Sequence, residues 1–231
     1  MLLQIDTLPL DTMMTAAQQM VDPTAEKLTF MDLLFKGGWI MIPLGLLALI
    51  GLVIFFERYF TIRKATKYEK NLMVQVKQSV LSGKLESAIA ICRNNDSPLG
   101  RMLQKGLLRI GRPIKDIEGA IENVGKLEVA YLEKNINILG IIAGIAPMLG
   151  FVGTIIGVIS IFHEVELEGV INIGTVSGGL YIKMVSSATG LIIGIIAYIG
   201  YHILNMMVDR IILRMETDAV EFIDLLEEPI S

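Results

Sequence analysis

The sequence of 231 residues has very little of the chemistry that most enzymes use. It contains one cysteine, Cys92, and two histidines, so neither an internal disulfide nor a cysteine-based zinc site is available. It has no Gly-x-x-x-x-Gly-Lys-Ser/Thr phosphate loop, and His163-Glu164 lacks the second histidine of a zinc-protease motif. The net charge of −4 gives no basic excess for nucleic acid. We therefore expect no enzyme, no cofactor, no metal and no nucleic-acid partner.

Charge is almost missing from three long stretches of the chain. Hydrophobic residues make up 53% of the sequence and charged residues 19%, and the mean hydropathy is +0.60. A helix needs about 20 apolar residues to cross a bilayer, and apart from Lys36 and Glu57 at the two ends of the first stretch, Lys183 is the one charge within these stretches. The sequence predicts an all-α integral membrane protein with three transmembrane helices, at residues 36–57, 136–162 and 173–208.

Lysine and arginine are distributed unevenly around the three predicted spans. They follow the first span at Arg58 and Arg63, precede the second at Lys134 and follow the third at Arg210, whereas the connection after the second span carries three glutamates and no lysine or arginine. The positive-inside rule then places the N-terminus in the periplasm and the C-terminus in the cytoplasm. The remaining segments are an external amphipathic stretch (1–35), a cytoplasmic helical region (58–135), a periplasmic loop (163–172) and a cytoplasmic helix extension (209–231).

Apolar residues at helical spacing continue beyond the second and third spans. One series starts after Pro113, which suits the first turn of a helix, and another continues past Val208 as far as Leu226. The pattern predicts two very long helices that extend into the cytoplasm, the first running unbroken from Pro113 into the second span. Shorter helices near 72–81, 85–92 and 99–110 are expected to complete a bundle with them.

Small residues cover one face of the second span and one face of the third. Three pairs have the Gly-x-x-x-Gly spacing, starting at Gly140, Gly153 and Gly190. Such faces let helices approach closely in lipid, so we expect tight helix packing and self-association, with packing alone as the simpler alternative. The predicted packing residues are Pro147, Gly150, Gly153, Gly157, Gly190 and Gly194.

Four of the polar residues within these apolar spans are candidates for a functional role. The hydroxyls of Thr154, Ser186 and Ser187 would line a polar path, or else bond back to a carbonyl one turn earlier. Lys183 costs about 2.5–3.5 kcal/mol at membrane depth on insertion scales. It would either extend to the outer interface or pair with a carboxylate on another chain. Apart from Glu57 at the end of the first span, the spans of this chain contain no aspartate or glutamate, so a carboxylate at membrane depth must come from a partner.

The second span resembles the signature helix of a known family. Ala146-Pro147, Gly150, Gly153-Thr154 and Gly157 match the pattern A-P-x-x-G-x-x-G-T-x-x-G of the ExbB/TolQ/MotA family of proton-driven motor proteins. The stretch from Ser186 to Leu191 is similar to the A-T-A-x-G-L of the family's third span. The resemblance extends from about residue 35 to residue 228, and three spans resemble ExbB or TolQ better than the four-span MotA.

The resemblance implies a homopentamer in the bacterial inner membrane that encloses an ExbD-type one-span protein. Protons, the coupling ion, would pass the partner's membrane aspartate, and the motion would reach a TonB-type protein that energises outer-membrane uptake. Thr154 matches the family threonine that faces this path, and Ser187 takes the place of the third-span threonine. Ile182 departs from the pattern, since ExbB and TolQ have a glutamate there. A TolQ-like role in envelope maintenance and a non-conducting membrane scaffold remain as alternatives.

Overall fold

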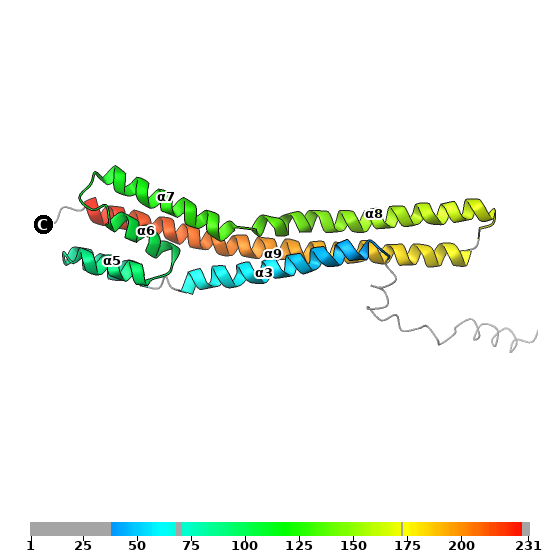
Figure 1. Cartoon of the computed structure of the whole chain (residues 1–231), viewed down its shortest axis with the longest axis horizontal. Coiled ribbons are helices and arrows are strands. Elements are labelled where there is room, and N and C mark those ends of the chain that lie inside the picture. The colour runs from blue at the N-terminus through cyan, green and yellow to red at the C-terminus, as the bar shows by residue number, and fades with distance from the viewer. Residues whose placement is uncertain (1–37, 68–70, 172, 228–231) are drawn as a thin grey trace, which may run out of the picture.

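The computed structural model describes residues 38–67, 71–171 and 173–227, and within these ranges the chain forms helices and no strands (Figure 1). The amphipathic segment predicted over residues 1–35 lies outside the described residues. The helices are α3 (Met41–Lys67), α4 (Leu72–Leu81), α5 (Leu85–Asn94), α6 (Pro98–Leu107), α7 (Ile114–Glu133), α8 (Ile136–Glu168) and α9 (Ile173–Glu227).

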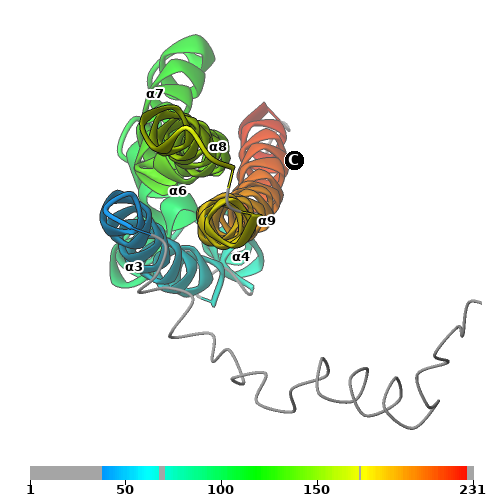
Figure 2. The same cartoon turned by 90° about the vertical axis from the view of Figure 1, so that its right-hand side faces the viewer.

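Three of these helices are long and apolar enough to cross a membrane. The apolar stretches lie in α3, in the region from Ile114 to Glu168 and in the region from Val176 to Glu227. Helix α9 packs against both α3 and α8, and the three form a bundle that is clear in the end-on view (Figure 2). Many large apolar side chains of this bundle are exposed, including Ile42, Phe151 and Ile196. The chain is therefore a membrane protein whose three-helix bundle offers an apolar surface to lipid or to other proteins.

The predicted continuous helix from Pro113 into the second span is interrupted in the structure. Helix α7 ends at Glu133, Lys134 has an extended backbone, and Asn135 has a φ of 64°, in the left-handed region that asparagine tolerates better than most residues. Helix α8 then begins at Ile136. Only one of the two expected very long helices is continuous: α9, whose 55 residues correspond to about 80 Å.

The acidic connection between the second and third spans is shorter than the predicted loop over residues 163–172. Helix α8 continues through the acidic residues as far as Glu168. Gly169 ends the helix with a φ of 66°, and its backbone N–H donates to the carbonyl oxygen of Val165. A glycine in the left-handed conformation is the usual residue at such a helix end.

Helices α4, α5, α6 and α7 and the part of α9 after Val208 form a second body, which we call the end bundle (Figure 1). Its core contains Val76, Leu103, Met215 and Phe222, all essentially inaccessible to solvent. Ser97 caps α6, because its hydroxyl accepts a hydrogen bond from the backbone N–H of Gly100 at 3.0 Å. This core is continuous with buried residues of the three long helices, including Ile54, Leu139 and Leu204.

One arginine links the short helices of the end bundle to α7. The guanidinium of Arg101 donates from Nε and Nη2 to the two carboxylate oxygens of Glu128, at 2.6 and 2.7 Å. Its Nη1 donates to Asp96 at 2.8 Å. This paired geometry suits arginine and a carboxylate, and it fixes α6 against α7 near the end of the membrane spans.

The single cysteine is expected to be inert in the folded protein. Cys92 is 1% exposed, and burial raises the pKa of its thiol to about 12. Because the thiolate is the reactive form, maleimide labelling at pH 8 should be slower by a factor on the order of a thousand than for an exposed thiol. Labelling should become complete after denaturation in SDS, as measured by mass spectrometry.

A matched control for this labelling is a cysteine on the surface of the same bundle. Ser82→Cys in a Cys92→Ala background places a thiol at an exposed position just after α4. This variant should label within minutes under conditions that leave the native protein unmodified. Rapid labelling of native Cys92 would contradict the burial of this α5 side chain.

Candidate functional site

The small-residue faces of the second and third spans face each other within one chain. A Cβ atom placed on Gly190 would lie 2.5 Å from the carbonyl oxygen of Ala146, and one on Gly194 would lie 2.5 Å from Cγ of Pro147. From α8, a Cβ atom on Gly150 would lie 2.8 Å from the carbonyl oxygen of Ser186. The missing side chains therefore let the α8 and α9 backbones approach each other closely, as small residues do in membrane helices.

The three Gly-x-x-x-Gly pairs do not have the same surroundings. Gly153 and Gly157 both contact α9, since a Cβ atom at these positions would meet Ser186 and the stem of Lys183. Gly140 faces the ring of Tyr201, whereas a Cβ atom on Gly144 would meet nothing within 4 Å. The packing of α8 against α9 accounts for most of this small-residue surface, and Gly144 is left open.

Two hydroxyls meet at one carbonyl group in the α8–α9 contact. Thr154 Oγ1 on α8 lies 3.1 Å from the carbonyl oxygen of Lys183 and 3.3 Å from that of Gly150. Ser186 Oγ donates to the same Lys183 carbonyl at 2.8 Å and is 1% exposed. Of the two readings from the sequence, Ser186 follows the local one, whereas Thr154 also bonds across to the neighbouring helix.

Ser187 contributes to the contact through its backbone. A Cβ atom on Gly150 would lie 3.0 Å from Cα of Ser187, whose side chain is half-buried. The nearby Thr189 donates to the carbonyl of Val185, within its own helix, at 2.8 Å. The side chain of Ile182, which replaces the family glutamate, lies outside the described side chains.

The stem of Lys183 crosses α8 at Gly157 and directs its ammonium towards the beginning of α3. A side chain at Gly157 would collide with Cγ and Cδ of Lys183, so the glycine leaves the space that the aliphatic stem of Lys183 occupies. The ammonium Nζ lies 3.9 Å from the place a Cβ atom would take on Gly38, just before the exposed Trp39. Lysine and tryptophan at the same level are typical of a membrane interface. The charge is thus brought to the edge of the bundle, while the backbone of Lys183 stays among the hydroxyls.

Arg58 is a buried charge whose role the sequence did not reveal. In the sequence it counts only towards the positive-inside rule, but in the structure it is 4% exposed. Its Nη1 donates to the backbone carbonyl of Tyr131 at 3.2 Å, and its Nη2 pairs with Glu57 at 2.5 Å. The bond fixes α3 against the last turn of α7, directly before the break at Lys134 and Asn135. An arginine next to the end of an apolar run was the available signal, although it does not distinguish a buried from an exposed side chain.

Within the described residues, no group of three or more histidine, cysteine, aspartate or glutamate side chains is placed to hold a metal ion. What the spans provide instead is a glycine-lined helix contact, hydroxyls on one carbonyl and a single cation at the rim. These features define a class: multi-span membrane proteins built around a close-packed, hydroxyl-bearing helix pair.

Residues 94–217 match the family described as the MotA/TolQ/ExbB proton channel family, and this is more than half of the chain. The chain belongs to this family. The matched region contains α6, α7, α8 and most of α9, and thus the whole α8–α9 contact described above.

Two distant relatives extend over most of the chain, and a third is more similar over a shorter region. An ExbB homologue of Methanothermobacter thermautotrophicus is 23% identical over 197 residues, which cover 84% of this chain and 68% of the relative. An ExbB-like protein of Synechocystis is 22% identical over 191 residues, covering 81% of this chain and 91% of the relative. The biopolymer transport protein ExbB of Helicobacter pylori is 34% identical over 71 residues, 31% of this chain and 49% of the relative.

Proposed function

We propose that this chain is the ExbB-like subunit of a motor driven by the proton-motive force in a bacterial inner membrane. Several copies, expected to be five, would enclose an ExbD-type one-span protein, and a TonB-type protein would pass the motion to outer-membrane transport. The N-terminus would be periplasmic and the end bundle cytoplasmic. The observation that carries this proposal is the pair of hydroxyls on the Lys183 carbonyl, within spans that contain no carboxylate of their own.

In this mechanism the Thr154 hydroxyl would accept hydrogen bonds, and a carboxylate of the partner would carry the proton. Thr154 uses its one proton in a bond to a backbone carbonyl, so its oxygen can still accept hydrogen bonds from water or from a protonated acid. A partner's aspartate would take up and release the proton, while the α8–α9 wall holds it in place. One charge that crosses 100 mV supplies about 2.3 kcal/mol, so a few protons can switch a packed helix contact between two arrangements.

Two alternatives have support from the sequence. A TolQ-like role uses the same machinery to maintain the envelope, and the spans do not distinguish it from the ExbB-like role. A non-conducting membrane scaffold is favoured by Ile182, which removes the carboxylate that ExbB and TolQ carry in the third span. Proton flux separates the scaffold from both motors.

We expect Thr154→Val to lower partner-dependent proton flux at least several-fold without loss of the complex. Valine keeps the shape of the side chain but removes the oxygen that accepts hydrogen bonds. The tagged chain would be co-purified with its one-span partner, reconstituted in liposomes and assayed with an internal pH-sensitive dye. Thr189→Val is the matched control, because that hydroxyl bonds within its own helix. Equally negligible flux for the unmodified complex and both variants would leave only the scaffold.

Lys183→Met tests whether the lysine acts through its charge. Methionine retains most of the stem that crosses Gly157 and removes the ammonium, so the chain should fold and assemble normally. We propose that the Lys183 ammonium, at the edge of the bundle, pairs with a carboxylate of the partner, so partner-dependent flux should fall several-fold in this variant and in Lys183→Ala. Normal flux in Lys183→Met, with disturbed assembly in Lys183→Ala alone, would assign the lysine a structural role.

A further inference from the structure

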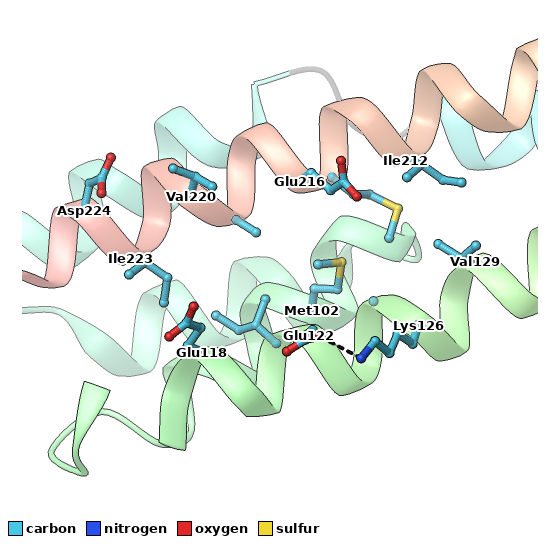
Figure 3. A pocket seen from close by; sticks show the side chains of 14 residues that line it. Met102, Glu118, Glu122, Lys126, Val129, Ile212, Glu216, Val220, Ile223 and Asp224 are labelled. Carbon is cyan, nitrogen blue, oxygen red and sulfur yellow. Dashed lines mark ion pairs between the residues drawn. The ribbon is translucent and has the colours of Figure 1, made fainter. Parts of the chain in front are cut away.

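A groove of about 660 Å³ runs along the end bundle between α7 and α9, and neither the proposed ion path nor the packing of the spans accounts for it (Figure 3). Its walls are the facing sides of the two helices, with α6 beneath them. The floor is apolar and is formed by Met102, Ile121, Met215 and Ile223. Because this surface belongs to the charged end bundle, it faces water rather than lipid acyl chains, and no described segment of the chain fills it.

The rim of the groove carries mostly negative charge. Glu118 and Glu122 line it on α7, and Glu216 and Asp224 line it on α9 (Figure 3). The one basic residue in the lining is Lys126, and it is paired with Glu122 at 2.6 Å. Three acidic side chains therefore remain uncompensated by any cation within the lining, along both edges of an apolar floor.

Small residues keep the centre of the groove open. Gly125 on α7 is buried, and a Cβ atom placed there would lie 3.1 Å from Cε of Met102. Ala219 faces the groove from α9. A glycine inside a helix costs about 1 kcal/mol relative to alanine, so this position lowers the stability of α7 while leaving room for Met102 in the floor of the groove.

We propose that this groove binds a cationic amphipathic helix of a partner protein. The groove follows α9 from Ile212 to Asp224, about three helical turns, so the bound segment would have about 12 residues. Apolar side chains three and four residues apart would enter the groove, and lysine or arginine would face the acidic rims. Anionic lipid headgroups do not fit this charge, and residues 228–231 contain Glu228 and no lysine or arginine.

The test uses a fluorescent reporter inside the groove. Val220 is 61% exposed, so Val220→Cys in a Cys92→Ala background accepts a bimane label without disturbing the core. The full chain, in nanodiscs of zwitterionic lipid, would be titrated with a 14-residue peptide of leucine and lysine with an amphipathic helical pattern. We expect a saturable shift of the bimane emission that weakens with salt. A scrambled peptide of the same composition should produce no saturable shift.

Two double variants with the same change in net charge decide whether the groove is the binding site. Glu216→Gln with Asp224→Asn neutralises the exposed α9 rim and should weaken peptide binding about tenfold. Glu86→Gln with Glu133→Gln neutralises two exposed carboxylates that do not line the groove, and should change binding less than twofold. Equal weakening in both variants, or no saturable binding, would overturn the proposal. So would a rim variant that binds peptide normally but changes the number of copies in the complex, because the groove would then accommodate a second copy.

Discussion

Gly190→Leu is expected to prevent the chain from accumulating as a folded membrane protein. At this position the nearest atoms are backbone: the carbonyl oxygen of Ala146 at 2.5 Å and Cα of Gly150 at 3.0 Å from a Cβ atom. Backbone atoms cannot move aside as a flexible side chain can, so α8 and α9 would have to separate. Overpacking typically costs about 1–3 kcal/mol, and contact with backbone atoms should place Gly190→Leu at the upper end, a large part of the stability of a typical protein.

Gly144→Leu is the matched control, in the second span and with the same change in side chain. Nothing lies within 4 Å of a Cβ atom there, so the folded protomer should tolerate leucine. Membrane yield and the elution profile in mild detergent would measure both variants. Normal yield and elution of Gly190→Leu would contradict the close α8–α9 packing. Normal yield with altered oligomer size in Gly144→Leu would instead indicate contact between copies at Gly144.

The sequence was sufficient to predict the spans and the small-residue helix faces. Charge-free runs longer than about 18 residues have few alternatives to a transmembrane helix. The Gly-x-x-x-Gly pairs that start at Gly153 and Gly190 stand out because their two glycines are about one helical turn apart. The sequence could not show that the small-residue faces of α8 and α9 pack against each other within one chain. The spacing identifies such a face but does not identify the helix that packs on it.

The spacing of apolar residues does not predict the break between α7 and α8. Apolar residues keep their helical spacing across Lys134 and Asn135, and neither proline nor glycine marks the site. Asparagine is more tolerant of positive φ than most residues, yet most asparagines within helical patterns remain helical. Next to the break, Arg58 donates a hydrogen bond to the carbonyl of Tyr131, 73 positions along the chain, and helical spacing contains no information about such a contact.

The polar partners and the groove also required the three-dimensional structure. Thr154 and Lys183 are separated by 29 positions, and only the antiparallel packing brings the hydroxyl to the carbonyl. The groove depends on α7 and α9, which are far apart in the chain, and on the missing side chain of Gly125. Sequence patterns identify which residues are unusual, whereas their pairing is a property of the packed chain.

Arg58→Ala is expected to destabilise the protein by about 2–4 kcal/mol. The side chain is almost fully buried, so alanine leaves a cavity and removes the cation from Glu57. It also leaves the carbonyl oxygen of Tyr131 without the donor from Nη1. The apparent melting temperature of the detergent-solubilised protein should fall. Hydrogen exchange at residues 131–135 should become faster, because the last turn of α7 loses its contact with α3.

The comparison of three variants separates the causes of this effect. Arg63→Ala removes an exposed arginine of the same helix and should cost no more than about 0.5 kcal/mol. Arg58→Met fills most of the space without the charge, so its effect should lie between those of the two alanine variants. If Arg58→Met matched the unmodified protein in both melting temperature and exchange at residues 131–135, packing alone would explain Arg58. Faster exchange at residues 131–135 in Arg58→Met would show that the hydrogen bond to Tyr131 holds the break in place.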